Sequence, residues 1–559
     1  MKRKVSLLLA LALVMASLCM TATAEETRTV TMLTQRHPDT PVANAEDLWF
    51  IQHLQEKFNI KLDVTQVTDE ALSQQIALMF NTGYLPDLVW SRLKNNDCML
   101  YGVEQGLILA WNDYLNEETM PNAYKAMQDY PEAFAAATAP DGKLYSLPYI
   151  KGAVFDNNTG AFTGTIRVYV NQKWLDACGL AVPQTLDELL DTLRAFKEED
   201  PMGVGEALVP CIDNQNKFKD LIWNALGFYG ASGGQKYGTN FAIKNEEVVL
   251  PCYTQEAKAF LEFMKTLYTE GLISEDYFTL DQTTNHGLMA QGVCGLFGDS
   301  TLSALPDEQK FDWVAVAPLG SDYSNMRVAS TNFGYSIGTY AAANSVNIDL
   351  IVAITDYLYS DLGATLYSSG PMTGGDYSDF GHARWYYDEE TKVMTTDDVK
   401  NGTYIDLSNG VCPYYYISGR FDNVNNYRYE LLGLECDIPS AAITDKITGK
   451  TVECLYTKKL DPTNANDYWR YIQSEACADY CTFVCLPSTY LAADQQAVVT
   501  DIQVQVQNYV NEQSAKFITG ARSLDEFDAY LDELKAMGIE DYIDVYKDAY
   551  SSYMESIFG

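Results

Sequence analysis

Apolar and polar residues in the first ninety positions follow two different spacings in turn. Residues 29–33 alternate as a half-buried strand does, and the next apolar residues recur at the spacing of a helix face: Leu48, Ile51, Leu54 and Phe58. Further short strands are predicted at 60–64 and 88–90, with a helix ending at Phe80 between them. Strands separated by helices in this way indicate an α/β lobe with a mainly parallel sheet.

The same alternation resumes after a loop rich in Gly, Asn and Thr at 151–165, where we expect the chain to cross into a second lobe. Later short strands are predicted at 166–170, 293–297, 311–317 and 333–337. Helices are predicted from the capping box at 185–188, over 254–271, over 349–359, and from 494 to the end with a second capping box at 523–526. The segment 370–475 is dense in Tyr and Trp without a clear period, which indicates loops and hairpins.

A chain of 559 residues is too long for one hydrophobic core, since single cores stop growing at about 250–300 residues. Two lobes are therefore predicted. We assign residues 27–150 and about 287–345 to lobe 1. Lobe 2 is expected to comprise 151–286 and about 346–559, including the Tyr-rich region 370–475.

The amino terminus has the features of an export signal. Lys2, Arg3 and Lys4 precede an apolar run from Val5 to Leu18, and 22–24 (Ala-Thr-Ala) has the small residues of a cleavage site. The run is shorter than the roughly 20 residues needed to span a bilayer, so we expect residues 1–24 to be removed, with a retained anchor as the alternative. The mature protein is then expected to be secreted or held at the cell surface.

The charge excludes several classes of partner. The chain has 38 basic against 76 acidic residues, a net charge of −38. Removing the three bases of the signal brings the charge to −41. Such a field repels nucleic acid and anionic lipid surfaces, so we expect neither as a partner.

The cysteines fit no strong metal or disulfide pattern. Eleven of the 12 follow Cys19, an odd number that cannot pair completely. We expect mostly buried thiols, with Cys436 and Cys454 as the best disulfide candidates because they flank a predicted hairpin around 448–450. The helical spacing of Cys477, Cys481 and Cys485 favours three core thiols over a metal site.

Four short motifs resemble those of the family 1 extracellular solute-binding proteins of ABC importers, especially the carbohydrate-binding lipoproteins of Gram-positive bacteria. They occur in the same order as in that family: Gly-Tyr-Leu-Pro-Asp at 83–87, Asp-Gly-Lys-Leu-Tyr-Ser-Leu-Pro at 141–148, Pro-Gln-Thr-Leu-Asp-Glu at 183–188, and Leu-Tyr-Thr-Glu-Gly-Leu-Ile at 267–273. The carboxyl-terminal Lys-Phe-Ile-Thr-Gly at 516–520 is similar as well. Only 370–475 lacks a counterpart.

The resemblance implies an α/β, two-lobed periplasmic-binding-protein-like fold of type II, with a ligand cleft between lobes joined by crossing strands. It implies capture of an oligosaccharide by hinge closure and delivery to ABC permease subunits. We expect a monomer without a cofactor. Leu18 stands where the lipobox has a small residue, so lipid anchoring at Cys19 is not expected.

Calcium is a second departure from the family. Some relatives, such as alginate-binding proteins, have an Asp-rich loop of EF-hand character at the equivalent of 200–205. Calcium requires six or more oxygen ligands. Met202 and Val204 occupy positions that should supply oxygen, so we expect no metal there.

Candidate ligand contacts lie after predicted strands, because ligands of α/β folds bind at the carboxyl ends of strands. Aromatic faces suit sugar rings, and polar side chains suit their hydroxyls. In lobe 1 these rules select Arg36, His37, Trp90, Arg92 and, at the crossing, Tyr149. Elsewhere they select Trp223, Tyr229, Asp299 and Trp385. Each Trp could instead pack in a core, and each Arg could form a surface ion pair.

Two other functions share the export signal. A glycan-processing enzyme would need a pair of catalytic carboxylates or a nucleophile with its base, but the four His have no metal-ligand spacing and no Gly-x-Ser-x-Gly motif occurs. We therefore expect no catalytic residues. A surface sensor or adhesin with the same fold stays open, because the surface that meets the partner has no motif.

Overall fold

The computed structural model describes most of the chain beyond the export signal. The described residues are 27–35, 44–90, 97–153, 167–214, 216–230, 235–324, 326–331, 333–370, 386–388, 393–395, 418–421, 427, 440–444, 451–455, 461–483 and 490–558. The predicted signal, Cys19 and most of the Tyr-rich region therefore lie outside them. No helix in the described ranges has both the length and the apolar character needed to cross a membrane.

Lobe 1 is built on the sheet β13-β3-β1-β2. β1 (Arg28–Gln35) runs parallel to β2 (Ile60–Val67) and to β3 (Leu88–Trp90), and β13 (Tyr340–Ala341) is antiparallel to β3. Alternate residues of β1 point to opposite faces, as the sequence pattern predicts. Val30 and Met32 pack in one core, and Leu33 packs in the other.

Helices cover both faces of this sheet. They are α2 (Trp49–Phe58), α3 (Asp69–Thr82), η2 (Cys98–Glu104), α5 (Pro121–Asp129), α6 (Pro131–Ala137), α13 (Ile348–Tyr359) and α14 (Asp361–Ser369), with short turns η1 (Ala45–Asp47) and η3 (Trp111–Asp113). The apolar stripes of α2 and α13 meet in the larger core, and α3 and η2 supply the smaller one.

Lobe 2 is built on the sheet β10-β5-β9-β6. β6 (Cys211–Asp213) and β9 (Leu296–Gly298) are parallel, whereas β5 (Val168–Asn171) is antiparallel to β9 and to β10 (Trp313–Ala315). Around it lie α7 (Gln172–Cys178), α8 (Leu186–Glu199), η4 (Gly205–Ala207), α9 (Lys217–Ala225), the hairpin β7 (Ala242–Lys244) and β8 (Glu247–Val249), η5 (Pro251–Tyr253), α10 (Glu256–Thr269), α11 (Gln282–Ala290), α12 (Asp307–Lys310) and α18 (Ala465–Cys477).

The predicted lobe boundaries are wrong in two segments. β9 and β10, expected in lobe 1, are hydrogen-bonded into the lobe 2 sheet. The helices α13 and α14, expected in lobe 2, pack in the lobe 1 core. The chain thus returns to lobe 1 only after β10. Local periodicity predicts that a strand exists but not which sheet it joins, since sheet membership depends on pairing distant in sequence.

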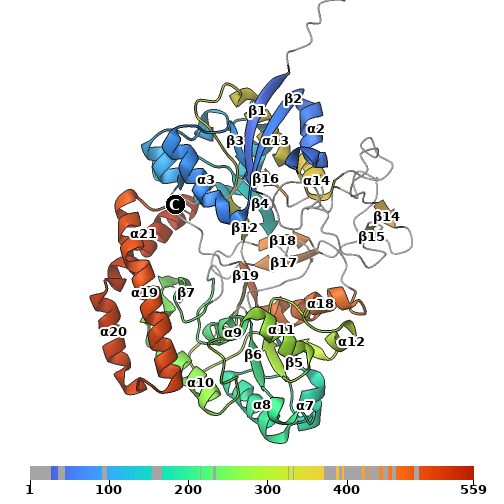
Figure 1. The fold of residues 1–559 in the computed structure, drawn as a ribbon, viewed down its shortest axis with the longest axis vertical. Helices are drawn as coiled ribbons and strands as arrows, with labels where there is room; N and C mark the ends of the chain where they lie inside the picture. The colour runs from blue at the N-terminus through green and yellow to red at the C-terminus, as the bar shows by residue number, and fades with distance from the viewer. Residues whose placement is uncertain are drawn as a thin grey trace, which may run out of the picture.

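Short strands connect the lobes (Figure 1). β4 (Pro148–Ala153) pairs with β12 (Phe333–Ile337) and β16 (Gly419–Arg420), and β11 (Ala329–Thr331) pairs with β19 (Cys481–Phe483). The hairpins β14 (Tyr386–Asp388) with β15 (Val393–Thr395) and β17 (Ser440–Thr444) with β18 (Thr451–Leu455) are also present. The second is the hairpin predicted around 448–450.

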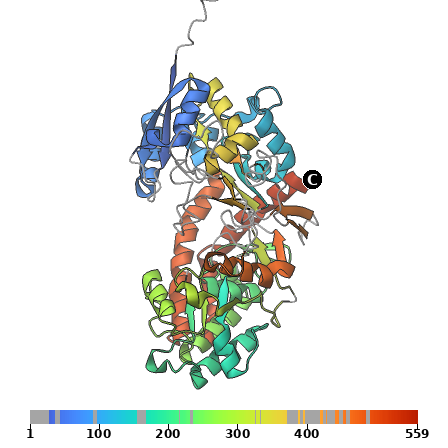
Figure 2. The ribbon, with the colours of Figure 1, turned by 90° about the vertical axis from the view of Figure 1, so that its right-hand side faces the viewer.

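Carboxyl-terminal helices run beside both lobes (Figures 1 and 2). α19 (Ala493–Thr519) packs on α10, and α20 (Phe527–Ala536) follows the turn η8 (Leu524–Glu526). α21 (Ile539–Phe558) contacts β8 of lobe 2 and α6 of lobe 1. This last helix therefore bridges the two bodies that the connecting strands join.

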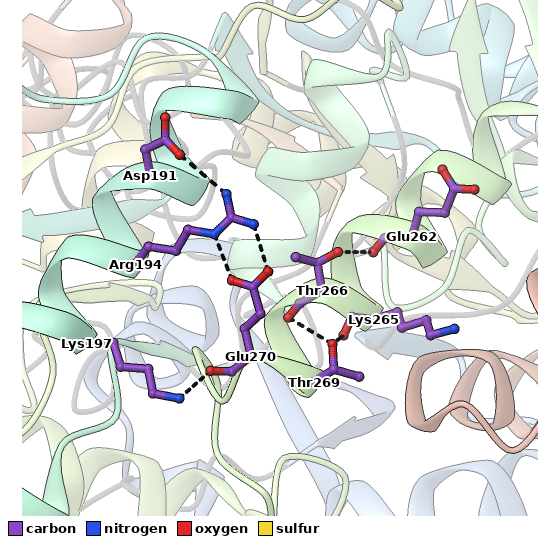
Figure 3. A network of polar contacts seen from close by, with 8 residues as sticks. All are labelled: Asp191, Arg194, Lys197, Glu262, Lys265, Thr266, Thr269 and Glu270. Atoms are coloured by element: carbon purple, nitrogen blue, oxygen red, sulfur yellow. Dashed lines mark hydrogen bonds and ion pairs between the residues drawn. The ribbon is translucent and has the colours of Figure 1, made fainter.

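Two of the four motifs that resemble those of the family lie at helix ends and make structural contacts there. Thr185 caps α8 by accepting a hydrogen bond from the Glu188 N–H, as the capping box predicts. At the end of α10, Glu270 pairs with Arg194 of α8 through two bonds of 2.7 Å each, and Lys197 donates to the Glu270 carbonyl (Figure 3). Glu270 therefore joins α10 to α8, and Gly271 supplies the positive φ of +62 that ends α10.

Six cysteines of the described residues are free thiols: Cys98, Cys178, Cys211, Cys252, Cys294 and Cys477. The expected helical row of three is wrong, because α18 ends at Cys477 and Cys481 begins β19 after the turn η7 (Ala478–Tyr480). Cys436 and Cys485 lie outside the described residues, so the Cys436–Cys454 disulfide stays a prediction.

Candidate functional site

The carboxyl ends of the parallel strands in both sheets point toward the connecting strands. In Figure 1, β1 and β3 run downward through lobe 1, and β6 ends beside α9 and α11 on the inner side of lobe 2. Helices α7 and α8 lie at the opposite, outer end of lobe 2. Residues that follow these strands therefore face the region between the lobes, which is where α/β folds bind ligands.

In lobe 1, the carboxyl ends of β1 and β3 carry buried polar and aromatic residues. Thr34 donates its hydroxyl to the Trp90 carbonyl at 3.3 Å, which ties the ends of β1 and β3 together. The Trp90 ring is fully buried and meets Tyr367 edge-on, so it serves the core and offers no face to a ligand. This corrects its assignment as a contact. Arg36, His37 and Arg92 lie outside the described residues, so their roles stay predictions.

A buried ion pair lies at the end of β6. The Asp213 carboxylate is 2.5 Å from the Lys219 ammonium, accepts the Phe218 N–H at 3.0 Å and accepts the Tyr277 hydroxyl at 3.2 Å. The Lys219 ammonium also lies 4.8 Å from the centre of the Tyr277 ring. These contacts join β6, the first turn of α9 and the loop before α11 into one rigid unit.

A second polar group follows β9. Asp299 is buried and accepts from the Asn214 amide at 3.0 Å, while the His286 ring nitrogen lies 2.8 Å from the same carboxylate oxygen. Asn214 follows β6 and His286 comes from α11, so three elements meet at this carboxylate. The role of Asp299 as a ligand contact stays a prediction.

The start of α9 lies tightly against the end of β9. A side chain at Gly298 would come within 2.4 Å of the Phe218 nitrogen, so only glycine permits this approach. The approach brings Lys217 and Asp220 beside the two polar groups.

Burial raises the pKa of Asp220 to about 7, which leaves this carboxyl part neutral near physiological pH. We name the resulting set the polar edge: Asp213, Asn214, Lys217, Lys219, Asp220, His286 and Asp299.

Sequence reasoning found only Asp299 of the polar edge. The others follow β6 or begin the helices beside it, so the rule that selected Asp299 would also have selected Asp213 and Asn214. The three-residue strand was missed because Pro210 interrupts the apolar residues directly before it.

The remaining predicted contacts are not part of the polar edge as defined above. Trp223 is wrong as a contact, because it is buried in the lobe 2 core with its ring centre 4.2 Å from that of Phe260. Tyr229 is buried beside Ile243 and Val328, near the connecting segment. Tyr149 lies on β4 with its ring 4.9 Å from Phe421, at the predicted crossing. Trp385 lies outside the described residues.

The loop after α8 does not fit a calcium ion. The two carboxylate oxygens of Asp200 accept the N–H groups of Val204 at 2.7 Å and Gly205 at 2.8 Å, so the carboxylate closes the loop itself. Met202 and Val204 add no side-chain oxygen. Within the described ranges, no group of three His, Cys, Asp or Glu residues could hold a metal ion.

This loop gives a test. Asp200→Ala removes two hydrogen bonds to a charged acceptor and is expected to lower the free energy of unfolding by about 1–2 kcal/mol. Glu206→Ala, in the same loop, serves as control and should change it by less than about 0.5 kcal/mol. Melting temperatures of the wild type with and without EDTA should coincide. A fall in melting temperature on chelation would mean that the loop holds a metal after all.

Comparison with known proteins decides the family. The sequence profile described as bacterial extracellular solute-binding protein matches residues 40–364, more than half of the chain. The chain belongs to this family. The match begins shortly before η1 and ends within α14. It therefore includes every strand of the lobe 2 sheet of this solute-binding protein and, apart from β1, the strands of the lobe 1 sheet.

Individual relatives extend the likeness to almost the whole solute-binding protein. The fructooligosaccharide ABC transporter substrate-binding protein FusA of Streptococcus pneumoniae is 24% identical over 543 residues, 95% of this chain and 91% of that protein. A polygalacturonan/rhamnogalacturonan-binding protein of Bacillus subtilis, YtcQ, is 24% identical over 46% of this chain and 47% of its own length.

Solved structures agree on the fold. A solute-binding protein for human milk oligosaccharides (HMO) from Bifidobacterium longum infantis superposes with a TM-score of 0.73 at 19% identity, covering 95% of this chain and 99% of the other. FusA in complex with kestose gives 0.67 at 19% identity, covering 94% and 99%. The solute-binding protein thus has the two-lobed, type II periplasmic-binding-protein-like architecture.

Proposed function

We propose that this chain is the extracellular substrate-binding component of an ABC importer and that it binds an oligosaccharide between its lobes. The observation that supports this most directly is the polar edge of lobe 2, which gathers its charged and polar side chains at the ends of β6 and β9 and the start of α9. FusA, the relative matched over nearly its whole length, is by name a fructooligosaccharide-binding protein of an ABC transporter.

The chemistry of the polar edge suits sugar hydroxyls. A hydroxyl both donates and accepts hydrogen bonds, and it needs fixed partners of both kinds. The polar edge offers carboxylates, an amide, an imidazole and ammonium groups within one small region. Their mutual hydrogen bonds hold them in place before the ligand arrives, which lowers the entropy lost on binding.

Hinge closure would couple binding to transport. A ligand that touches both lobes does so only when they are closed, so its binding energy shifts the population toward the closed form. The paired strands β4, β12 and β16 are the natural hinge, because they form a sheet of their own that is separate from the sheets of the two lobes. Permease subunits would then distinguish the closed form from the open one.

The same proposal covers the oligomeric state, the location and the absence of a catalysed reaction. The protein acts as a monomer, outside the membrane, and it carries out no reaction on its ligand. Arg36, His37, Arg92 and Trp385 stay proposed ligand contacts, and Tyr149 is proposed to lie at the hinge.

A thermal-shift screen with oligosaccharides tests the proposal. A ligand at about 100 times its dissociation constant should stabilise the protein by about 2.7 kcal/mol, and calorimetry should give one site per chain. Chromatography of the recovered sugar should find it unchanged. If neither fructose-based, milk-type nor plant cell-wall oligosaccharides move the transition, the proposed ligand class is wrong.

A further inference from the structure

One charged group of the polar edge makes no hydrogen bond to the rest of the described protein. Among the described residues, the Lys217 ammonium has one charged group within 4 Å, the Asp220 carboxylate at 3.9 Å, which is too far for a hydrogen bond. An ammonium has three donors. All three are therefore unused within the part of the chain that the structure describes.

Lys219, two residues later on the same helix, shows the contrast. Its ammonium bonds Asp213 at 2.5 Å and Asn216 at 3.1 Å, and it faces the Tyr277 ring. Its side chain is 5% exposed. Lys219 is thus a structural residue, whereas Lys217, with a side chain 20% exposed, is enclosed but still open to solvent on one side.

Holding Lys217 in this position costs free energy. Burial lowers the pKa of Lys217, and the nearby Arg167 guanidinium lowers it further, although Asp220, Asp213 and Asp299 act in the opposite direction. An enclosed ammonium without hydrogen bonds has lost part of its hydration without compensation. The close packing of Gly298 on the α9 backbone nonetheless keeps it at the strand ends.

We propose that Lys217 is a ligand-contacting residue that donates hydrogen bonds to a hydroxyl oxygen of a neutral oligosaccharide. This inference rests on the proposed function and specifies its substrate class. A hydroxyl fits because it can accept from Lys217 while donating to a neighbouring carboxylate of the polar edge. A uronate carboxylate accepts only, so it has no proton to share with the Asp213 and Asp299 carboxylates and would add a negative charge beside them.

The test is Lys217→Met, which keeps the length of the side chain and removes the charge. Affinity for the best neutral oligosaccharide of the wild type should fall at least tenfold, about 1.4 kcal/mol. The melting temperature of the ligand-free variant should stay level or rise, since no hydrogen bond within the described protein is lost. Lys217→Gln, which retains an amide donor, should recover part of the affinity. Lys516→Met, on the distant helix α19, is the matched control and should bind as the wild type does.

The outcomes separate the inference from the function. Unchanged affinity in Lys217→Met would overturn the inference, and so would a melting temperature lowered by several degrees, which would mark Lys217 as structural. A wild type that binds only uronate-containing oligosaccharides would overturn the substrate class and leave the importer function standing. A wild type that binds no oligosaccharide at all would contradict the proposed function itself.

Discussion

Replacing Asp213 with alanine is expected to destabilise lobe 2 by about 3–5 kcal/mol, because it leaves the buried Lys219 ammonium without its carboxylate. The Asp213 side chain is fully buried, and its partner is 5% exposed, so water cannot replace the lost contact. The Phe218 N–H and the Tyr277 hydroxyl would lose their acceptor as well. Urea unfolding of the ligand-free protein, monitored by tryptophan fluorescence, measures the change.

Two further variants make this expectation specific. Asp213→Leu combined with Lys219→Met replaces both charges with apolar groups of similar size, and it should regain most of the lost stability because no charge is then buried alone. Glu512→Ala removes one partner of an exposed pair, Lys516–Glu512 on α19, and should cost less than about 1 kcal/mol. Equal losses in Asp213→Ala and in the double variant would mean that lost packing, not the unpaired charge, causes the effect.

The buried Asp213–Lys219 ion pair matters for the proposed function as well as for stability. Asp213 and Lys219 fix the first turn of α9 to the end of β6, and Lys217 lies on that same turn. A protein that closes on its ligand needs such fixed groups, because a contact 1 Å out of place loses much of its energy. The buried pair is therefore best understood as the support of the polar edge.

Much of the fold could be predicted from local pattern. The strands β1, β2 and β3 were found because each has an alternating or continuous apolar run bounded by turns, and the start of α8 was found because Thr185 and Glu188 form a capping box. Sheet membership could not be predicted. β9 and β10 pair with β5 more than 120 residues away, and no local signal records that pairing.

The site was less predictable than the fold for a related reason. Asp299 follows the predicted strand at 293–297, so the strand-end rule found it. The equally short β6 was missed because Pro210 interrupts the apolar residues directly before it. Trp223 was selected as an aromatic residue near a helix end, but Lys219 and Asp220 of α9 are buried as well. A helix enclosed on most sides has no exposed face for periodicity to predict, and a Trp on it packs in the core.

The second prediction with a large expected effect on stability concerns Asp87 of the Pro-Asp motif at 86–87. The Asp87 carboxylate accepts hydrogen bonds from the Thr31 N–H and the Thr31 hydroxyl, both at 2.8 Å, from the Ser345 hydroxyl at 2.5 Å and from the Asn347 amide at 3.3 Å. One side chain therefore ties β1, the start of β3 and the loop before α13. This is a physical reason for a family to keep an aspartate at the turn.

Asp87→Ala is accordingly expected to lower the free energy of unfolding at pH 7 by about 3 kcal/mol, since hydrogen bonds to a charged group contribute about 1.5–3 kcal/mol each and part of that is regained by water. Burial alone would raise the pKa of Asp87, but the bonds from Ser345, Thr31 and Asn347 outweigh it and hold the pKa below the ordinary 3.8. A carboxyl with a lowered folded pKa stabilises the protein above its unfolded pKa, and this contribution disappears as pH falls through the folded value. The difference between wild type and variant should thus be constant from pH 5 to 7 and shrink below about pH 4.

Asp349→Ala, in the first turn of α13, is the matched control. Asp349 pairs with Arg28 of β1 but is 67% exposed, so its loss should cost less than about 1 kcal/mol at pH 7. Urea midpoints measured from pH 3 to 7 for the three proteins would distinguish the two carboxylates. If the stability gap between wild type and Asp87→Ala stayed the same down to pH 3, the gap would come from altered packing at the turn. The charge of Asp87 would then have no part in joining the sheet of lobe 1 to α13.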